Sequence, residues 1–150
     1  MKTIASKYFG DIEYTDDSTV VFPEGIPGFE EQQGFLLVQQ PQSRPLVFLQ
    51  SLATPELCFL ALPAQLACPD YRFELAAEDL EALGLPSGRQ PVAGKEVLYL
   101  AIVSIDKDSS ISANLLAPLV INLESHRGRQ AILNGSGYSH RHPIEAPPCS

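Results

Sequence analysis

The sequence predicts a mostly β protein: a small antiparallel, β-barrel-like domain with one or two short helices. Short apolar runs recur at close intervals between turn residues, which is the pattern of a barrel or a sandwich. Thirteen prolines and ten glycines among 150 residues supply many turns, and helix-rich folds rarely carry so many breakers. A hydrophobic content of 45% is enough for one domain of this length to bury a core.

The expected strands are short segments that are apolar or alternating and that end at turn residues. They are Thr3–Ala5, Tyr8–Tyr14, Thr19–Phe22, Phe35–Gln39, Leu46–Ser51, Cys58–Leu62, Tyr71–Leu75, Glu96–Ile105, Ser112–Leu116, Leu119–Leu123 and Arg129–Leu133. The strongest of them is Glu96–Ile105, which is apolar at nearly every position from residue 97 onward. We expect both faces of this strand to be covered, so that it lies at the centre of the core.

One helix is expected at Ala76–Gly84. This segment has good helix formers, Leu80 and Leu83 at i,i+3 spacing, acidic residues in its first turn and a glycine at its end. Phe29–Gln33 is a candidate for a single turn. The following loop, Gly84–Gly94, contains two prolines and three glycines, and we expect it to vary in conformation more than its neighbours.

Neither an internal repeat nor a long linker divides the chain. We therefore expect one domain at residues 1–144, followed by a flexible tail at residues 145–150. The first residues lack the apolar core of a signal peptide, and no run reaches the roughly 18 apolar residues of a membrane span. These features predict a cytoplasmic protein that does not enter a membrane.

The charge distribution favours a basic protein as partner. The net charge is −8; residues 1–90 carry thirteen acidic and five basic residues, whereas residues 91–150 carry five of each. An acidic surface repels the phosphate backbone, so direct binding to nucleic acid is not expected. One acidic island extends from residue 70 to residue 81, and Arg72 is its only base. Solvated surface that keeps the protein soluble is the alternative interpretation of any single acid.

The sequence lacks the marks of an enzyme or of a cofactor site. Neither a nucleophile elbow nor a phosphate loop is present, and no pair of carboxylates is singled out by its surroundings. His140 and His142 lie on one face if extended, but His126 is the only other histidine, so a surface turn is preferred to a metal site. Cys58 and Cys68 are expected to be packing residues.

The run Ser112–Asn122 is apolar and strand-like, yet it is interrupted by a proline. Because proline cannot donate to a sheet ladder, we expect Pro118 at a sheet edge, a bulge or a corner. Asn114 and Asn122 need partners for their side-chain amides, since asparagine is depleted in strands. Either the amides hydrogen-bond to backbone groups near the proline, or they hydrogen-bond to the main chain of a partner at a sheet edge.

Three irregular motifs, Phe22–Glu30, Ser112–Asn122 and Tyr138–Ile144, occur here in the order in which the FliW family of flagellar assembly factors has them. The chain resembles that family over roughly residues 2–144. Two loops, Gln39–Pro45 and Ala64–Cys68, and the proline-rich tail depart from the family pattern. The resemblance implies a small cytoplasmic β-barrel-like protein without enzymatic activity or cofactor.

The resemblance also implies two protein partners. One is flagellin, bound through its C-terminal region before export, and the other is CsrA, an RNA-binding translational regulator. A protein free of flagellin would bind CsrA at a surface distinct from the RNA-binding site of CsrA. This binding would relieve the repression of flagellin messenger RNA. Flagellin synthesis would then follow the pace of export, and the free protein is expected to be a monomer.

Contact residues for both partners follow from the resemblance together with the residues. For the basic CsrA, we expect contacts at the acidic residues Asp70, Glu74, Asp79 and Glu81. For flagellin, whose terminal segments are expected to fold on binding, we expect the surface around Asn114, Leu115, Pro118 and Asn122. The alternatives are a β-barrel module that holds a small ligand in an apolar cavity, and a structural subunit of an assembly.

Overall fold

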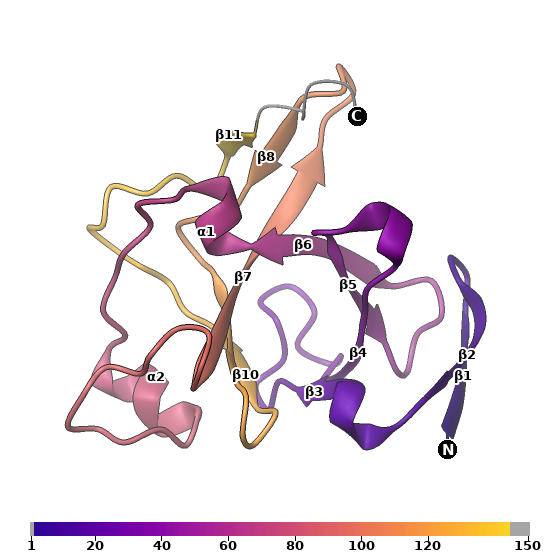
Figure 1. The fold of residues 1–150 in the computed structure, drawn as a ribbon, viewed down its shortest axis with the longest axis horizontal. Coiled ribbons are helices and arrows are strands. Elements are labelled where there is room, and N and C mark those ends of the chain that lie inside the picture. Colours follow the sequence, from indigo (N-terminus) through magenta and orange to yellow (C-terminus); the bar gives the residue numbers. More distant parts are fainter. Residues whose placement is uncertain (1, 145–150) are drawn as a thin grey trace.

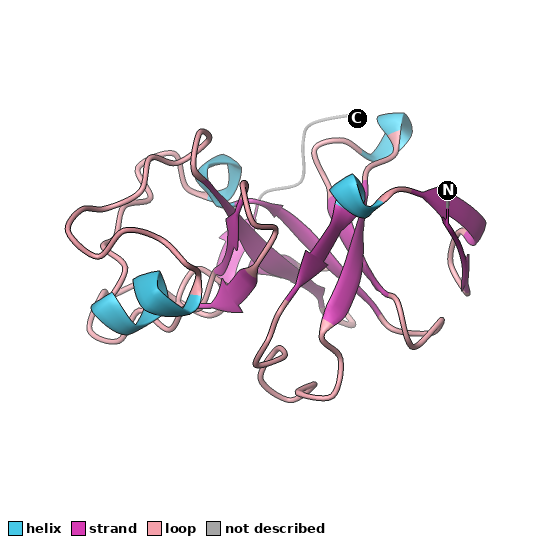
Figure 2. Ribbon diagram, turned by 90° about the horizontal axis from the view of Figure 1, so that it is seen from below, coloured by secondary structure: helices cyan, strands magenta, loops and turns pink. Residues whose placement is uncertain are grey.

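The computed structural model describes residues 2–144, and the expected tail at 145–150 lies outside the described residues. The strands are β1 (Lys2–Ser6), β2 (Gly10–Tyr14), β3 (Thr19–Val21), β4 (Gly34–Val38), β5 (Val47–Ser51), β6 (Cys58–Pro63), β7 (Val97–Ile105), β8 (Ile111–Ala113), β9 (Leu119–Asn122), β10 (Gly128–Gln130) and β11 (His142–Ile144). The helices are α1 (Ala64–Ala67), α2 (Ala77–Ala82) and the 3-10 turns η1 (Asp16–Ser18) and η2 (Pro41–Ser43). The predicted class, mostly antiparallel β with short helices, is confirmed (Figures 1 and 2).

One antiparallel sheet forms the body of the molecule. Its strands follow the order β10-β9-β7-β6-β5-β4-β3, and β8 with β11 extends it beside β7. Within residues 2–144 no continuous ladder closes this sheet, but a single bridge joins Val21 to Arg127. At this bridge the Val21 N–H donates to the His126 carbonyl at 2.9 Å. The sheet is therefore an incomplete barrel, and the β1–β2 hairpin stands to one side of it (Figure 1).

Strand β7 divides two hydrophobic clusters, as its sequence predicts. Val97, Tyr99 and Ala101 face the first cluster, which is covered by α1 and α2. The alternate residues, among them Leu98 and Leu100, face the second cluster inside the curled sheet. Because successive residues of a strand point to opposite faces, a strand covered on both faces reads as a continuous apolar run.

The proline of the run at 112–122 lies at a corner, as expected. Strand β8 pairs with Val103–Ile105 of β7, and β9 pairs with Val97–Leu100 of the same strand. Pro118 comes directly before β9, in the segment that connects the two pairings. Its missing N–H therefore interrupts no ladder, and its carbonyl still accepts from the Ala131 N–H at 3.0 Å.

The expected strand at Tyr71–Leu75 is wrong. The segment has the alternating burial of a strand, but side chains rather than a neighbouring strand bond its backbone. The Tyr138 hydroxyl accepts from the Arg72 N–H at 2.9 Å and donates to the Arg72 carbonyl at 3.0 Å. The Gln90 amide bonds the N–H and the carbonyl of Leu75 at 2.7 and 3.1 Å. Alternation predicts burial, and it does not identify the hydrogen-bond partner.

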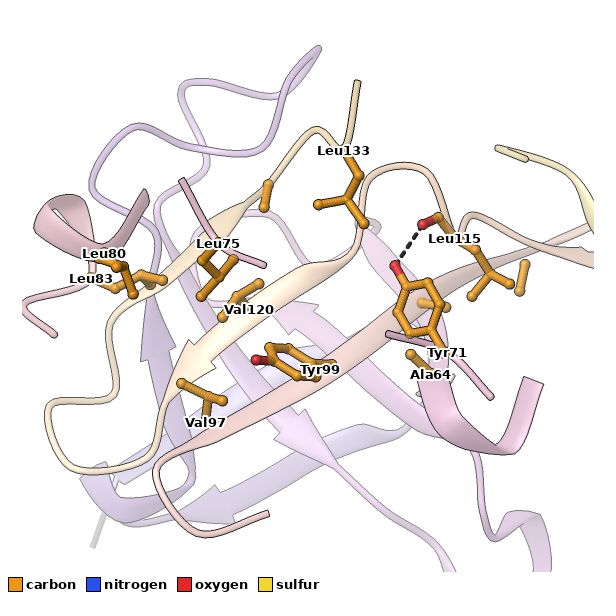
Figure 3. Packing of buried hydrophobic residues seen from close by; sticks show 13 residues of the cluster. Ala64, Tyr71, Leu75, Leu80, Leu83, Val97, Tyr99, Leu115, Val120 and Leu133 are labelled. Carbon is orange, nitrogen blue, oxygen red and sulfur yellow. Dashed lines mark hydrogen bonds between the residues drawn. The ribbon is translucent and has the colours of Figure 1, made fainter. Parts of the chain in front are cut away.

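The first cluster ties this segment to the run at 112–122. Tyr71 lies among buried side chains and donates its hydroxyl to the Leu115 carbonyl at 2.5 Å (Figure 3). Burial raises the pKa of the Tyr71 phenol, so that it remains a donor. Leu75, Leu80 and Leu83 complete the packing over β7 and β9 in the same view.

Helix α2 lies where the sequence predicts a helix, and its end has the expected glycine. Leu80 and Leu83 point into the first cluster, and Gly84 adopts φ +72°, a conformation that favours glycine. Residues 29–32 form a turn, in which the Gln32 N–H donates to the Phe29 carbonyl at 2.9 Å. This agrees with the expected single turn.

The loop Gly84–Gly94 is anchored at its far end. Arg89 makes two hydrogen bonds to the Glu96 carboxylate, at 2.7 and 2.8 Å, and the Val92 N–H adds a third at 2.9 Å. The bonds from Arg89 and then from Val92 hold the pKa of Glu96 at about 2. Greater conformational variation of this loop stays a prediction.

The 3-10 turns η1 and η2, helix α1 and strand β11 were not expected from the sequence. Helix α1 occupies most of the segment Ala64–Cys68, which was expected to be a loop; it buries Ala64 and leaves Leu66 exposed. Strand β11 lies where a surface turn was expected, and Pro143 sits in its middle, paired with Ser112 of β8. A strand that contains proline carries a weak sequence signal, which is why its pairing was missed.

Candidate functional site

The residues expected to contact flagellin are mostly inside the protein. Leu115 is fully buried in the first cluster, Pro118 and Asn122 are buried, and Asn114 is half-buried. The expected exposed surface at these positions is therefore corrected by the structure. This run is apolar because it lies in the core, where its two strands, β8 and β9, pair with the two halves of β7.

The amides of the two asparagines satisfy nearby backbone groups, which is one of the two interpretations left open above. Asn122 donates to the Leu83 carbonyl at 2.8 Å and accepts from the Glu124 N–H at 2.9 Å. Asn114 accepts from the Ala117 N–H at 3.0 Å. Asn114 thus holds the turn that follows β8, whereas Asn122 holds the turn after β9 and connects β9 to the end of α2.

Arg129 on β10 gathers carboxylates from two distant segments. Its Nε lies 2.8 Å from Asp79, and its two terminal nitrogens lie 2.7 Å from Glu78 and 2.5 Å from Glu24. The side chains of Arg129 and Asp79 are only 18% and 13% exposed, whereas the two glutamates are mostly exposed. Asp79 therefore belongs to a largely buried ion pair rather than to an exposed acidic island.

The other residues expected to contact CsrA are exposed but do not all lie together. Glu74 and Asp79 line one shallow hollow of about 550 Å³, beside Tyr138. Glu81 is exposed two residues after Asp79, which places it toward the opposite side of α2. Asp70 is exposed and does not line the hollow.

We call the set of carboxylates around Arg129 and this hollow the acidic surface, and its members are Glu24, Glu74, Glu78 and Asp79. Glu24 was missed as a member because it lies 105 residues before Arg129 in the chain. No local pattern signals a contact over that separation.

A second surface is apolar and was not expected as a site. It is a groove of about 360 Å³ between η2, β6, α1, the end of β7, β8 and β11. We call it the apolar groove, and it is lined by Ser43, Arg44, Pro45, Leu46, Leu60, Leu62, Leu66, Val103, Ile105, Ile111 and Ile144. Its only sequence signal is that the two loops which depart from the family pattern, Gln39–Pro45 and Ala64–Cys68, both contribute to it.

The apolar groove exposes large apolar side chains of a kind that is usually buried. Leu66 on α1 is 61% exposed and Ile105 at the end of β7 is 62% exposed. Figure 1 places α1, β8 and β11 at one end of the molecule, and α2 and β10 toward the other end. The apolar groove and the acidic surface are thus separate.

Groups that could support other chemistry are few in the described part of the chain. Residues 2–144 contain no group of three or more histidine, cysteine or acidic side chains that could hold a metal ion. Burial raises the pKa of the Cys58 thiol to about 11, which disfavours the reactive thiolate. Cys68 packs against the first cluster. Among the helices described, none is long and apolar enough to cross a membrane.

Comparisons with known proteins agree with the three motifs. The family model for FliW protein matches residues 3–144. The flagellar assembly factor FliW of Syntrophomonas wolfei is 38% identical over 145 residues, 96% of this chain and 89% of that protein. The FliW of Geobacillus kaustophilus is 39% identical over 141 residues, 94% of each chain. A crystal structure of the flagellar assembly factor FliW has a TM-score of 0.83 at 34% identity, covering 97% of this chain and 98% of that one. The chain therefore belongs to the FliW family of flagellar assembly factors.

Proposed function

We propose that this flagellar assembly factor acts without catalysis in the cytoplasm, where it binds flagellin and, when flagellin is scarce, binds the translational regulator CsrA. Family membership over nearly the whole chain supports the role. The observation that carries the proposal is the presence of two separate surfaces of different chemistry on one small domain. Two surfaces of unlike chemistry suit two unlike partners, and on a domain of 150 residues a protein bound at one surface can exclude the other by its own bulk.

The acidic surface suits a basic partner. Glu74 and Glu78 are exposed, and they belong to a chain with a net charge of −8. Complementary charge raises the rate at which a basic RNA-binding protein is captured and contributes to partner choice. We therefore place CsrA at this surface, with Glu74 and Glu78 as contacts and Asp79 as a residue that holds the surface together.

The choice between partners needs no enzyme. A protein that binds flagellin in one complex and CsrA in another distributes itself between them by mass action. Export of flagellin frees the assembly factor, which then captures CsrA and relieves repression of flagellin messenger RNA. Translation would in this way follow export.

The test is calorimetric titration of the protein with flagellin and with CsrA from the same organism. Each titration is then repeated after saturation with the other partner. We expect binding to both partners and mutual exclusion. Binding to flagellin alone would leave a chaperone role and contradict the regulatory half of the proposal. Binding to neither would contradict the whole proposal.

Charge reversal at the acidic surface separates attraction from folding. The variant Glu74→Lys with Glu78→Lys is expected to weaken CsrA binding by about tenfold at low salt, mostly through slower association. The loss should shrink at high salt, because exposed charges are screened over about 10 Å at 0.1 M ionic strength.

The matched control for this prediction is Asp11→Lys with Glu13→Lys. It changes the net charge by the same amount on β2, where both side chains are exposed. If the control weakens CsrA binding equally, only overall charge matters and the acidic surface is not the contact. Surface plasmon resonance at several salt concentrations measures both variants.

A module for a small apolar ligand is the second candidate, and the apolar groove is what favours it. Its volume of about 360 Å³ lies at the small end of ligand pockets, which span roughly 300–1,000 Å³. Native mass spectrometry of the purified protein would reveal a bound small molecule. A measured mass equal to that of the chain alone would contradict this candidate.

A further inference from the structure

The margin of the apolar groove carries cations, although the net charge of the protein is negative. Arg44 lines it directly, and Lys107 lies in the turn that follows Ile105, another lining residue. Neither cation forms an ion pair with any of residues 2–144. On a chain with a net charge of −8, these two cations beside an apolar surface are available to an acidic partner.

The carboxylates in the same turn are already engaged. Asp108 accepts from the Ser110 N–H at 3.0 Å and from the Ser110 hydroxyl at 2.7 Å, and these bonds hold its pKa below the usual range. Asp106 lies 4.0 Å from Arg141. The bonds from Ser110 do not cancel the charge of Asp108, but the charged side chains Arg44, Lys107, Arg141, Asp106 and Asp108 still sum to one positive charge. The margin of the apolar groove therefore complements an occupant that carries carboxylates.

The edge strand beside the apolar groove is poorly suited to accept a further strand. Strand β11 pairs with β8 on one side, and its middle residue is Pro143. Proline at a sheet edge removes an N–H that an added strand would need, and edge strands are commonly protected in this way. An occupant is therefore held by its side chains, as a helix laid into a groove is held.

We propose that the apolar groove binds the apolar face of an amphipathic helical segment of flagellin, with acidic residues of that helix beside Arg44 and Lys107. The inference rests on the proposed function, because that function supplies flagellin as the partner. It adds the location, the helical form of the bound segment and the sign of the charge along its flank. Leu66 and Ile105 are the central apolar contacts.

The two central contacts can be changed without disturbing the fold, since both side chains are mostly exposed. The variant Leu66→Asp with Ile105→Asp is expected to weaken flagellin binding by about tenfold or more, because anchors at the centre of an interface carry most of its affinity. Its affinity for CsrA is expected to stay within about twofold of wild type, as for additive, distant sites. Titration calorimetry measures both.

The control is Tyr8→Asp with Val92→Asp. It also replaces two exposed apolar side chains by aspartate, and both lie outside the apolar groove. Wild-type affinity for flagellin in the groove variant, with an unchanged melting temperature, would overturn the assignment of the groove while leaving the proposed function intact. No binding by wild type under the same conditions would overturn both.

Charge and helicity are tested separately. Arg44→Glu is expected to weaken flagellin binding several-fold at low salt and to match wild type at high salt, whereas the loss in the Leu66 variant persists at both. An unchanged affinity at low salt would contradict the acidic flank. Far-UV circular dichroism of a mixture with the C-terminal segment of flagellin should show a gain of helix, and a gain of strand would contradict the bound form.

Other occupants would show themselves in the same set of measurements. A small molecule retained in the apolar groove by native mass spectrometry, and displaced in the Leu66 variant, would overturn the proposal in favour of a ligand site. A wild-type dimer that becomes a monomer on Leu66→Asp, seen by sedimentation, would overturn it in favour of a second copy of this chain.

Discussion

Replacing Phe22 by alanine is expected to lower the free energy of unfolding by about 3–5 kcal/mol, the cost of removing a fully buried aromatic side chain. Phe22 has no exposed surface, and its ring packs edge-on against Phe35 with centroids 5.7 Å apart. It lies directly after β3, next to the bridge that joins the two ends of the sheet. The substitution therefore removes contacts in the core and also at the junction between β3 and β10, which we call the seam.

The position of Gly128 shows how tightly this seam is packed. A Cβ atom at residue 128 would lie 2.7 Å from the Phe22 ring, a distance that side chains do not tolerate. Chemical denaturation of Phe22→Ala measures the effect, with Phe29→Ala as the control. Phe29 is 42% exposed, so its loss is expected to be about 1 kcal/mol. Equal losses in the two variants would contradict the role given to Phe22.

The second large effect is expected at Arg129. Replacing Arg129 by methionine leaves Asp79 largely buried without its partner, and we expect a loss of about 3 kcal/mol in the free energy of unfolding. Glu24 and Glu78 are mostly exposed, so their lost pairs with Arg129 should add less than about 1 kcal/mol each.

The double variant Arg129→Met with Asp79→Leu distinguishes an unpaired charge from lost packing. If the unpaired carboxylate causes the loss, replacing both partners by apolar side chains should recover most of it. Arg89→Met is the matched control, because Arg89 also holds a carboxylate but is 54% exposed. We expect a much smaller loss of stability there, because exposed ion pairs contribute little. Urea denaturation at neutral pH would contradict the prediction if the Arg129 and Arg89 variants lost the same stability.

The features that are local in the sequence were predicted well. Strand β7 could be placed at the centre because its apolar residues occupy both faces, and the structure puts one cluster on each. Helix α2 was predicted from helix formers, spacing and a terminal glycine, all within nine residues. The corner at Pro118 followed from the missing N–H of proline alone.

Features that depend on distant segments could not be predicted from the sequence. The alternation at Tyr71–Leu75 reports burial correctly, but its hydrogen-bond partners include Tyr138, 66 residues from Arg72. The same limit applies to the acidic surface, where Glu24 meets Arg129 across 105 residues. An apolar run such as that around Leu115 does not reveal whether it is covered by the protein itself or by a partner.

The position of β7 between the two clusters makes unfolding of the molecule cooperative. Each of the two clusters packs against one face of this strand, so neither cluster is maintained when the strand detaches. Half of the chain, expressed alone, would carry an open core and would not fold. Loss of structure should accordingly be all-or-none, and hydrogen exchange at the central amides of β7 should report global unfolding.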